Sequence, residues 1–298
     1  MSDSRKISAL VTGCTPGGIG HALISEYQRR GCYVIATARN PAVLEELTRQ
    51  GFTAVRLDVT NQESIAQCKQ EVEKLTGGRL DILVNNAGRD HTIPALDIDI
   101  EDVKATYDAN VFGPMAMVSA FSSLLVPARG LIVNNSSISS RSWDLFCAAY
   151  GSSKVALNIY SRALRLELQP LGVRVMVLVT GTIRSNIVTH QQRSLPPGSY
   201  YEPVDDVFKW KIWYSQETET MPAEVYAKRV VSETLKGEGW LGGLIGGTPY
   251  ELWYGGLATG TWLFNFLPER VAHYIFSLYW GIAAMKRRMD AAREKKQT

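Results

Sequence analysis

The sequence predicts an α/β fold built around a doubly wound parallel sheet. Short apolar runs alternate with helical patterns from Ile7 to Val179. The runs are apolar along almost their whole length, as expected for strands that helices bury on both faces. A glycine-rich turn joins the first run to the first helical pattern. Right-handed crossovers between successive strands then give a Rossmann-type arrangement in a single domain.

Each expected element follows from the spacing of its apolar residues. The expected strands are Ile7–Val11, Tyr33–Ala38, Ala54–Asp58, Leu80–Val84, Gly130–Asn135 and Val173–Val179. The expected helices are His21–Arg30, Pro41–Gln50, Gln62–Leu75, Asp102–Leu125, Ala149–Leu168 and Pro222–Leu235. The regular alternation of the two kinds of element ends near Ile183.

The 298 residues suit one α/β domain with additions at its C-terminal end. We expect residues 1–190 to form the core and residues 191–238 to add a loop-rich stretch, His190–Glu219, followed by a helix. Residues 239–298 form an apolar extension with a basic end. The loop-rich stretch carries the aromatic residues Tyr200, Tyr201, Phe208, Trp210, Trp213 and Tyr214.

Composition and charge narrow the possible functions. The formal net charge of +3 is weak and gives no support for a nucleic-acid partner. The four cysteines form no C-x-x-C pair and no cluster with metal-ligand spacing, so we expect free thiols and no metal site. The polar start, Met1 to Lys6, lacks the pattern of a signal peptide, which favours a cytoplasmic protein.

The glycine-rich turn is a candidate phosphate-binding site. Thr12-Gly-Cys-Thr-Pro-Gly-Gly-Ile-Gly20 lies between the first strand and the first helix. Backbone N–H groups of such a turn can approach a pyrophosphate, and the helix dipole favours the negative charge. The candidate residues are Gly13, Gly18, Ile19 and Gly20. An ordinary strand-to-helix turn is the alternative, and the position after the first strand argues against it.

Arg39 points to the choice of dinucleotide. An Asp or Glu at the end of the second strand usually accepts from the ribose hydroxyl of NAD, and this chain has none there. The guanidinium of Arg39 could instead pair with a 2′-phosphate. We therefore expect NADP(H) as the cofactor, with a solvated surface arginine as the alternative.

Tyr150 and Lys154 are the candidate catalytic pair. They stand at i and i+4 of an expected helix, on one face. A free tyrosine has a pKa of about 10. A nearby ammonium would lower that pKa and make the phenol a better acid–base catalyst near neutral pH. A pair on a solvated helix face is the alternative.

Two further polar residues join this pair. Ser137 ends the fifth strand, where parallel strands line a ligand crevice, and its hydroxyl could donate to a developing alkoxide. Asn110 lies inside an expected helix although asparagine is a poor helix former. A polar role is plausible for Asn110, and a solvated helix residue is the alternative.

Together these motifs resemble the short-chain dehydrogenase/reductase family over roughly residues 6 to 190. The resemblance implies that Tyr150 is the general acid, that Ser137 orients the carbonyl, and that Lys154 also holds the nicotinamide ribose. It implies that Asn110 supports a proton-relaying water and that Asp58 contacts the adenine. It also assigns cofactor contacts to Asn86, Ala87, Gly88, Ile183 and Ser185, and it makes the segment after Ile183 a substrate lid.

Two positions depart from the family pattern. The glycine turn has one more residue between Gly13 and Gly18 than is usual, which puts the phosphate contacts of Cys14 to Gly17 in doubt. The usual Pro-Gly after the sixth strand is Thr180-Gly181. The aromatic residues of the lid suit a bulky hydrophobic substrate, and packing of a second small core is the alternative.

The C-terminal extension contains two runs without Asp, Glu, Lys or Arg, Leu252–Pro268 and Val271–Met285. Each is shorter than the roughly 20 residues that a membrane-spanning helix needs. The second is followed by Lys286-Arg-Arg288, so we expect attachment to a membrane surface. A subunit contact or a helix folded over the core is the alternative. Together with Met221-Pro-Ala-Glu-Val-Tyr-Ala-Lys228 and the extended glycine turn, the extension is similar to fungal NADPH-dependent 1-acyldihydroxyacetone-phosphate reductases. This resemblance implies endoplasmic reticulum or lipid droplets.

The leading hypothesis is the NADPH-dependent reduction of a ketone on a hydrophobic substrate. The substrate would be a lipid ketone such as 1-acyldihydroxyacetone phosphate, or a ketone of fungal secondary metabolism. The alternatives are a cofactor-binding protein without redox activity, or an isomerase or cyclase that uses the same pocket. The family resemblance further implies a homo-oligomer that assembles through the helices containing Asn110 and Tyr150.

Overall fold

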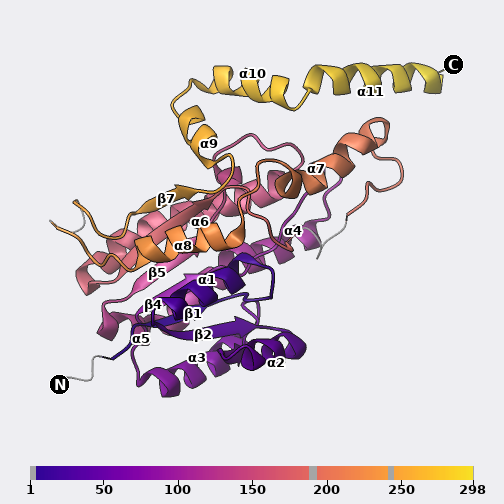
Figure 1. Ribbon diagram of the computed structural model, residues 1–298. Coiled ribbons are helices and arrows are strands. Elements are labelled where there is room, and N and C mark those ends of the chain that lie inside the picture. The colour runs from indigo at the N-terminus through magenta and orange to yellow at the C-terminus, as the bar shows by residue number, and fades with distance from the viewer. Residues whose placement is uncertain (1–4, 188–192, 241–244, 298) are drawn as a thin grey trace.

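The computed structural model describes residues 5–187, 193–240 and 245–297. Within these residues, seven parallel strands form one sheet in the order β3-β2-β1-β4-β5-β6-β7 (Figure 1). The strands are β1 (Ser8–Val11), β2 (Tyr33–Ala38), β3 (Thr53–Arg56), β4 (Ile82–Asn85), β5 (Leu131–Asn135), β6 (Arg174–Thr180) and β7 (Glu251–Tyr254).

The doubly wound topology is confirmed by the pairing of β1. This strand pairs with β2 on one side and with β4 on the other, so the strand order reverses there. The crevice at the carboxyl ends of the strands next to such a reversal is where α/β proteins of this kind bind their ligands. Residues that follow β1, β4, β5 and β6 therefore come together at one edge of the sheet.

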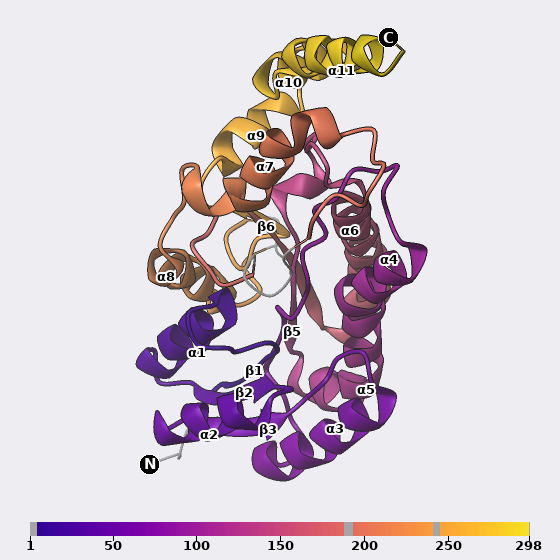
Figure 2. The same ribbon diagram turned by 90° about the vertical axis from the view of Figure 1, so that its right-hand side faces the viewer.

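Helices cover both faces of the sheet (Figure 2). One layer contains α1 (Ile19–Arg29), α2 (Pro41–Arg49) and α8 (Ala223–Thr234). The other contains α3 (Gln62–Thr76), α5 (Gly113–Ala128) and α6 (Ala148–Leu168). Each layer has its own apolar core against the sheet. The strands are buried on both sides, which explains why they are apolar throughout.

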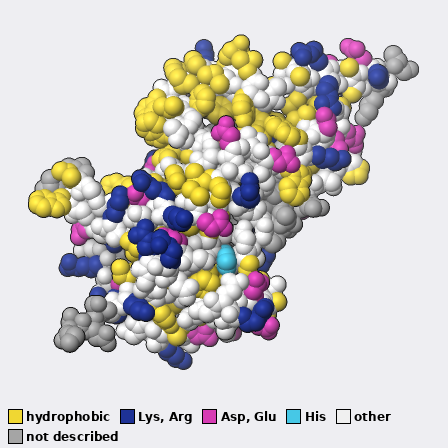
Figure 3. Space-filling model, viewed as in Figure 1, with side chains coloured by type: hydrophobic (Ala, Val, Ile, Leu, Met, Phe, Trp, Pro, Cys, Tyr) yellow, Lys and Arg dark blue, Asp and Glu magenta, His cyan; other side chains and the backbone are white. Residues whose placement is uncertain are grey.

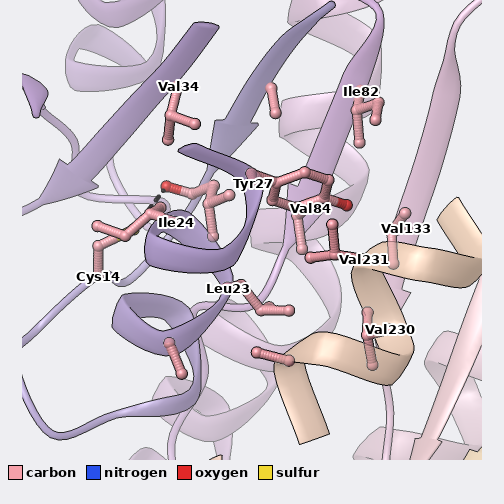
Figure 4. Packing of buried hydrophobic residues seen from close by; sticks show 14 of the residues in the cluster. Cys14, Leu23, Ile24, Tyr27, Val34, Ile82, Val84, Val133, Val230 and Val231 are labelled. Carbon is pink, nitrogen blue, oxygen red and sulfur yellow. Dashed lines mark hydrogen bonds between the residues drawn. The ribbon is translucent and has the colours of Figure 1, made fainter. Parts of the chain in front are cut away.

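The first core joins α1 and α8, which are far apart in the sequence (Figure 4). Leu23 and Tyr27 of α1 pack with Val230 and Val231 of α8 and with the strands beneath. The Tyr27 ring is fully buried, and its hydroxyl lies 2.8 Å from the Thr234 hydroxyl. The bond satisfies a polar atom that would otherwise be costly to bury. Helix α8 is thus part of the main domain. Each of its ends lies within one residue of the expected bound.

The expected helix Asp102–Leu125 is interrupted. The chain forms α4 (Ile100–Tyr107), a π-helical turn (Asp108–Phe112) and then α5. Pro114 has no N–H to donate to the carbonyl of Asn110, four residues earlier, so a regular α-helical ladder cannot pass this point. The stretch Ile100–Ala128 is the one helix of the described chain that is long and apolar enough to span a membrane. Because Phe121 and Leu124 of α5 are buried against the sheet, we assign it to the protein core.

The loop-rich prediction for His190–Glu219 is wrong for its second half, which forms α7 (Asp205–Glu217); residues 188–192 lie outside the described residues. Phe208 and Ile212 of α7 pack with Phe146, Val204 and Met285 in a small separate core. The aromatic residues of this stretch therefore serve partly as core, one of the two alternatives that the sequence left open.

The start of the C-terminal extension is part of the sheet. Strand β7 pairs in parallel with β6, with Glu251 beside Val177 and Tyr254 beside Thr180. The sequence did not predict this strand. Three helices follow: α9 (Ala258–Phe264), α10 (Glu269–Tyr279) and α11 (Ile282–Gln297). They lie beyond the carboxyl ends of the strands, and α11 extends past the body of the molecule (Figure 1).

Candidate active site

Tyr150 and Lys154 lie one turn apart at the start of α6, next to the carboxyl end of β5. The Lys154 ammonium is 5.7 Å from the centre of the Tyr150 ring. It donates to the backbone oxygen of Asn135 at 2.9 Å, and its side chain is buried. The expected pairing on one helix face is therefore present, and the alternative of a solvated helix face is wrong for Lys154.

Ser137 completes a compact group with this pair. It follows β5, and its side chain lies close enough to the Tyr150 phenol to act on the pKa of that group. Its hydroxyl oxygen also accepts from the backbone N–H of Ser139 at 3.1 Å, which fixes the side chain. Ser137, Tyr150 and Lys154 all line the same cavity. A carbonyl group in that cavity could thus meet two hydroxyl donors at once.

Burial, rather than the lysine, dominates the acidity of Tyr150. Burial raises the pKa of Tyr150 well above its ordinary value, and the negative charge of Asp90 raises it further. The neighbouring Ser137 hydroxyl opposes this increase. Lys154, which was expected to lower this pKa, is not among its largest influences, and the ammonium donates to the Asn135 carbonyl. Tyr150 is therefore protonated at neutral pH, as a general acid must be.

Lys154 is also shifted by its surroundings. Burial lowers its pKa from 10.5 to about 8, and no neighbouring carboxylate compensates among the described residues. An ammonium in a dry site with a single backbone acceptor has donors to spare. A ribose hydroxyl is a group that such an ammonium can bind.

Asn110 lies in the π-helical turn and holds the backbone of the neighbouring segment. Its Oδ1 accepts from the N–H of Arg89 at 2.9 Å, and its Nδ2 donates to the carbonyl of Arg89 at 3.0 Å. The same Nδ2 lies 3.1 Å from the hydroxyl of Ser153, which donates to the carbonyl of Tyr150 at 2.7 Å. Asn110 is buried, so the alternative of a solvated helix residue is wrong.

Polar side chains join the ends of the central strands. The Thr12 hydroxyl accepts from the N–H groups of Asn86 and Ala87. The Asn86 side chain donates to the carbonyls of Thr12 and Gly13, and its oxygen accepts from Asn135 at 3.0 Å. Because these groups satisfy one another, Asn86 and Ala87 hold the glycine-rich turn in place through packing and hydrogen bonds.

The glycine-rich turn fits an anionic group. A side chain at Gly20 would place Cβ 2.3 Å from the Gly13 carbonyl, so the turn packs against α1 as closely as glycine allows. Helix α1 starts at Ile19 without a side-chain cap and without an acidic residue in its first turn. Its free N–H groups and dipole are therefore available to a phosphate. The residues present fit the pyrophosphate of a dinucleotide.

Arg39 and Asp58 lie where the adenosine end of that dinucleotide would extend. Arg39 follows β2 and is exposed. Asp58 follows β3, and its Oδ1 accepts from the N–H and hydroxyl of Thr60 at 3.0 and 2.7 Å. Burial acts to raise the pKa of Asp58, but the Thr60 bonds and the charge of Arg39 lower it overall. The positive charge of Arg39 therefore stabilises the Asp58 carboxylate at this edge of the sheet.

The segment after β6 closes over the glycine-rich turn. Ile183 is buried, and the N–H of Ser185 donates to the Gln216 side chain of α7 at 2.9 Å. Asn186 donates to the carbonyl of Pro16 at 3.1 Å. Ile19, Ile183 and Ser185 all line the main cavity. The structure thus brings these predicted cofactor contacts to the same place as Tyr150.

The main cavity has a volume of about 260 Å³. Its floor is formed by the carboxyl ends of the strands, and its far wall by α7, α9 and α10. That wall presents apolar side chains, including Ile212, Phe264, Ile275, Phe276 and Trp280. Such a lining fits a largely apolar ligand. The C-terminal extension therefore contributes directly to the site.

Two charged residues of the cavity wall were not predicted from the sequence. The Lys211 ammonium of α7 lies 2.8 Å from a carboxylate oxygen of Asp144, and only 5% of the lysine side chain is exposed. Burial acts to lower the pKa of Lys211, but its neighbours Cys147 and Asp144 raise it overall. The sequence does contain a pattern that indicates a buried Lys211. This residue follows Phe208 at helical spacing and therefore falls on the buried face of α7.

The chain is similar in sequence to known proteins. Residues 8–195 match the family model of the short chain dehydrogenases. A protein of Neurospora crassa described as short-chain dehydrogenase srdE is 42% identical over 291 residues, covering 97% of each chain. A protein of Schizosaccharomyces pombe described as an NADPH-dependent 1-acyldihydroxyacetone phosphate reductase is 42% identical over 199 residues. That alignment covers 65% of this chain and 67% of the relative.

Solved structures show the same fold. A short-chain dehydrogenase from Streptomyces avermitilis superposes with a TM-score of 0.73 at 24% identity. The superposition covers 95% of this chain and 98% of that protein. It therefore includes nearly all of the sheet and the surrounding helices.

Proposed function

Because this chain belongs to the short-chain dehydrogenase family, we propose that it catalyses the NADPH-dependent reduction of a ketone on a hydrophobic substrate. The observation that carries the proposal is the single cavity that contains Tyr150, Ser137 and Lys154 and is closed by an apolar wall. Overall, the ketone, NADPH and one proton would give an alcohol and NADP+. Hydride transfer with protonation of the carbonyl oxygen balances this reaction.

The residues of the chain have separate roles in this reaction. NADPH, when bound, supplies the hydride. Ser137 donates a hydrogen bond to the carbonyl oxygen and positions it, and Tyr150 transfers its proton to that oxygen as negative charge develops. Lys154 binds the ribose and keeps a positive charge beside the phenol. Asn110 positions the segment from Asn86 to Arg89 next to both groups.

The preference for NADPH rests on Arg39. Arg39 is exposed beyond β2, where no carboxylate is present to bind a ribose hydroxyl. The uncapped start of α1 at Gly18 and Ile19 suits the pyrophosphate that NADPH and NADH share, so it supports dinucleotide binding rather than the preference. The relative from Schizosaccharomyces pombe is NADPH-dependent by its description.

Two substrate classes follow from the apolar cavity. One is a lipid ketone such as 1-acyldihydroxyacetone phosphate, which the description of the Schizosaccharomyces pombe relative supports. The other is an uncharged ketone of fungal secondary metabolism. The test follows NADPH absorbance with purified protein and a panel that contains an acyldihydroxyacetone phosphate, long-chain ketones and polycyclic ketones. Oxidation of NADPH by at least one ketone supports the proposal. Conversion of a substrate without NADPH oxidation would contradict it.

We also propose a homo-oligomer that forms through α6. Val155, Ile159 and Leu166 are exposed on this helix at helical spacing, with exposures of 43, 57 and 72%. A stripe of this kind is typical of a surface that a second subunit covers. The measurement is molecular mass by light scattering, and a monomer at micromolar concentration would contradict the proposal.

The C-terminal helices support peripheral attachment to a membrane, on the cytoplasmic side of the endoplasmic reticulum or on lipid droplets. Val271, Tyr274 and Leu278 form an exposed apolar stripe on α10, and further apolar residues of α9 lie beside it (Figure 3). Lys286 and Arg287 at the start of α11 are exposed. Apolar and basic residues side by side suit an anionic lipid surface.

A further inference from the structure

The Lys211–Asp144 ion pair stands out because it lies in an otherwise apolar part of the cavity wall. Lys211 is on α7, and Asp144 is in the loop between β5 and α6. The ammonium lies 5.0 Å from the ring centres of both Tyr214 and Trp280. The second carboxylate oxygen of Asp144 accepts from the Ser139 hydroxyl at 2.9 Å. A charged pair is costly to bury, so its position in the wall calls for an explanation beyond stability.

The pair has hydrogen-bonding capacity left over. An ammonium has three N–H donors. Among the described residues, Asp144 is the one hydrogen-bond acceptor that Lys211 contacts, and the two ring faces satisfy a cation only weakly. The carboxylate of Asp144 also has lone pairs beyond those used by Lys211 and Ser139. Both residues line the cavity, so a group that enters it can use this capacity.

The chemistry of the pair selects the kind of group. A donor beside an acceptor matches a hydroxyl, which both donates and accepts. A phosphate dianion fits poorly, because Asp90 and Asp144 are the anions of this wall. The nearby cations each have a partner in the chain: Arg89 pairs with Asp102, and Lys154 donates to the Asn135 carbonyl.

The arginines outside the cavity do not change this conclusion. Arg193 donates to the Asp102 carboxylate at 2.9 and 3.1 Å. Arg184 is exposed and is not part of the cavity lining. In the described wall, the cations Arg89, Lys154 and Lys211 each have a partner, and the carboxylates of Asp90 and Asp144 oppose the binding of a phosphate group.

We propose that the Lys211–Asp144 pair is a specificity-determining element that binds a hydroxyl group of an uncharged, otherwise apolar ketone. The pair would fix the orientation of the substrate so that its carbonyl group faces Tyr150 and Ser137. This inference rests on the proposed function for its substrate class. It predicts that the site binds hydroxylated ketones more tightly than phosphate-bearing acyl ketones.

The test measures binding rather than turnover. The full-length protein with NADP+ is titrated by calorimetry with 1-tetralone and with its monohydroxy derivatives, which are rigid and uncharged. We expect the best hydroxylated ligand to bind at least about tenfold more tightly than the parent ketone, as a hydrogen bond to a charged group allows. In Lys211→Met, this preference should fall to about twofold or less.

Lys209→Met is the matched control. Lys209 lies on the same helix, pairs with Asp205 at the surface, and has 70% of its side chain exposed. It should keep the wild-type preference. If Lys211→Met does not fold, as thermal unfolding will show, Asp144→Asn tests the same site with a neutral side chain of the same size. We expect the preference to fall in that variant too.

Three results would overturn the inference. They are equal binding of all ligands by the wild type, an unchanged preference in the variants, or tighter binding of an acyldihydroxyacetone phosphate than of any hydroxylated ketone. A purely structural ion pair would weaken the binding of parent and hydroxylated ligands by the same factor. A wild type that binds the hydroxylated ligand selectively but oxidises no NADPH with any ketone would refute the proposed function and leave the recognition site standing.

Discussion

The Asn110 side chain bonds both polar atoms of the Arg89 backbone, at 2.9 and 3.0 Å. Gly88, the residue before Arg89, packs closely against the same Asn110 side chain. A Cβ added at Gly88 would lie 2.8 Å from Asn110 Oδ1 and 3.7 Å from the Lys154 ammonium. The segment after β4 can therefore approach the catalytic residues only with glycine at this position.

Gly88→Ala tests this close approach. The added methyl group must displace Asn110 or the backbone, and we expect a loss of about 1–3 kcal/mol in the free energy of unfolding. Gly260→Ala is the matched substitution, because nothing lies within 4 Å of its added Cβ in helix α9. It should gain up to about 1 kcal/mol from the better helix propensity of alanine. Equal stability of the two variants in urea unfolding would contradict the predicted crowding at Gly88.

Lys154 predicts a pH dependence of stability. Its pKa in the folded state is about 8, below its ordinary value of 10.5, because burial disfavours the charged form. Between these two values the unfolded chain binds more protons than the folded one, so this lysine destabilises the fold less as pH rises. Urea unfolding at pH 7 to 10 should show wild type gaining stability relative to Lys154→Met. The expected slope is up to about 1.4 kcal/mol per pH unit above pH 8. A constant difference would contradict the lowered pKa.

Arg39 predicts the cofactor preference. Arg39→Ala removes the cation expected to bind the 2′-phosphate, so kcat/KM with NADPH should fall about tenfold to a hundredfold. The value with NADH should change little, because that cofactor lacks the phosphate. Arg49→Ala, at an exposed position near the end of α2, is the control and should leave both values unchanged. Equal losses with the two cofactors would assign Arg39 another role.

The stripe on α10 predicts binding to anionic vesicles. Tyr274→Ser combined with Leu278→Ser should reduce co-sedimentation with phosphatidylserine-containing vesicles several-fold, since the two side chains are 64 and 63% exposed. Leu96→Ser, at a residue 70% exposed elsewhere on the surface, is the control. A truncation from Leu252 is unsuitable because it would remove β7 from the sheet. Unchanged sedimentation of the double variant would exclude this stripe as the attachment surface.

The sequence predicted the central fold because its strands are buried on both faces. β1, β2 and β4 to β6 appear as apolar runs, and the polar residues that follow them gather at one edge of a parallel sheet. The site residues Ser137, Tyr150 and Lys154 were predictable for the same reason. Their positions follow from where a strand ends and from helical spacing, which are local properties of the chain.

The unpredicted parts depend on contacts between distant residues. β7 is a four-residue edge strand that exists through its pairing with β6, about 75 residues earlier, and its sequence lies within a longer aromatic run. The amphipathic pattern of α7 is weak because Lys211 stands on its buried face. That residue is stabilised by Asp144, a partner that no local pattern reveals. The direction of the Tyr150 pKa shift likewise depends on burial in the folded chain and on the charge of Asp90, 60 residues earlier.

The most direct test of the central claim is the rate of NADPH oxidation by Tyr150→Phe with a ketone that the wild type reduces. Tyr160→Phe, on the same helix and partly buried, is the control. We predict that Tyr150→Phe loses about 100-fold to 10,000-fold in kcat while binding NADPH normally, because its side chain has no proton to transfer. Tyr160→Phe should keep a kcat within about threefold of the wild type. A Tyr150→Phe variant with wild-type kcat would contradict the assignment of this tyrosine as the general acid.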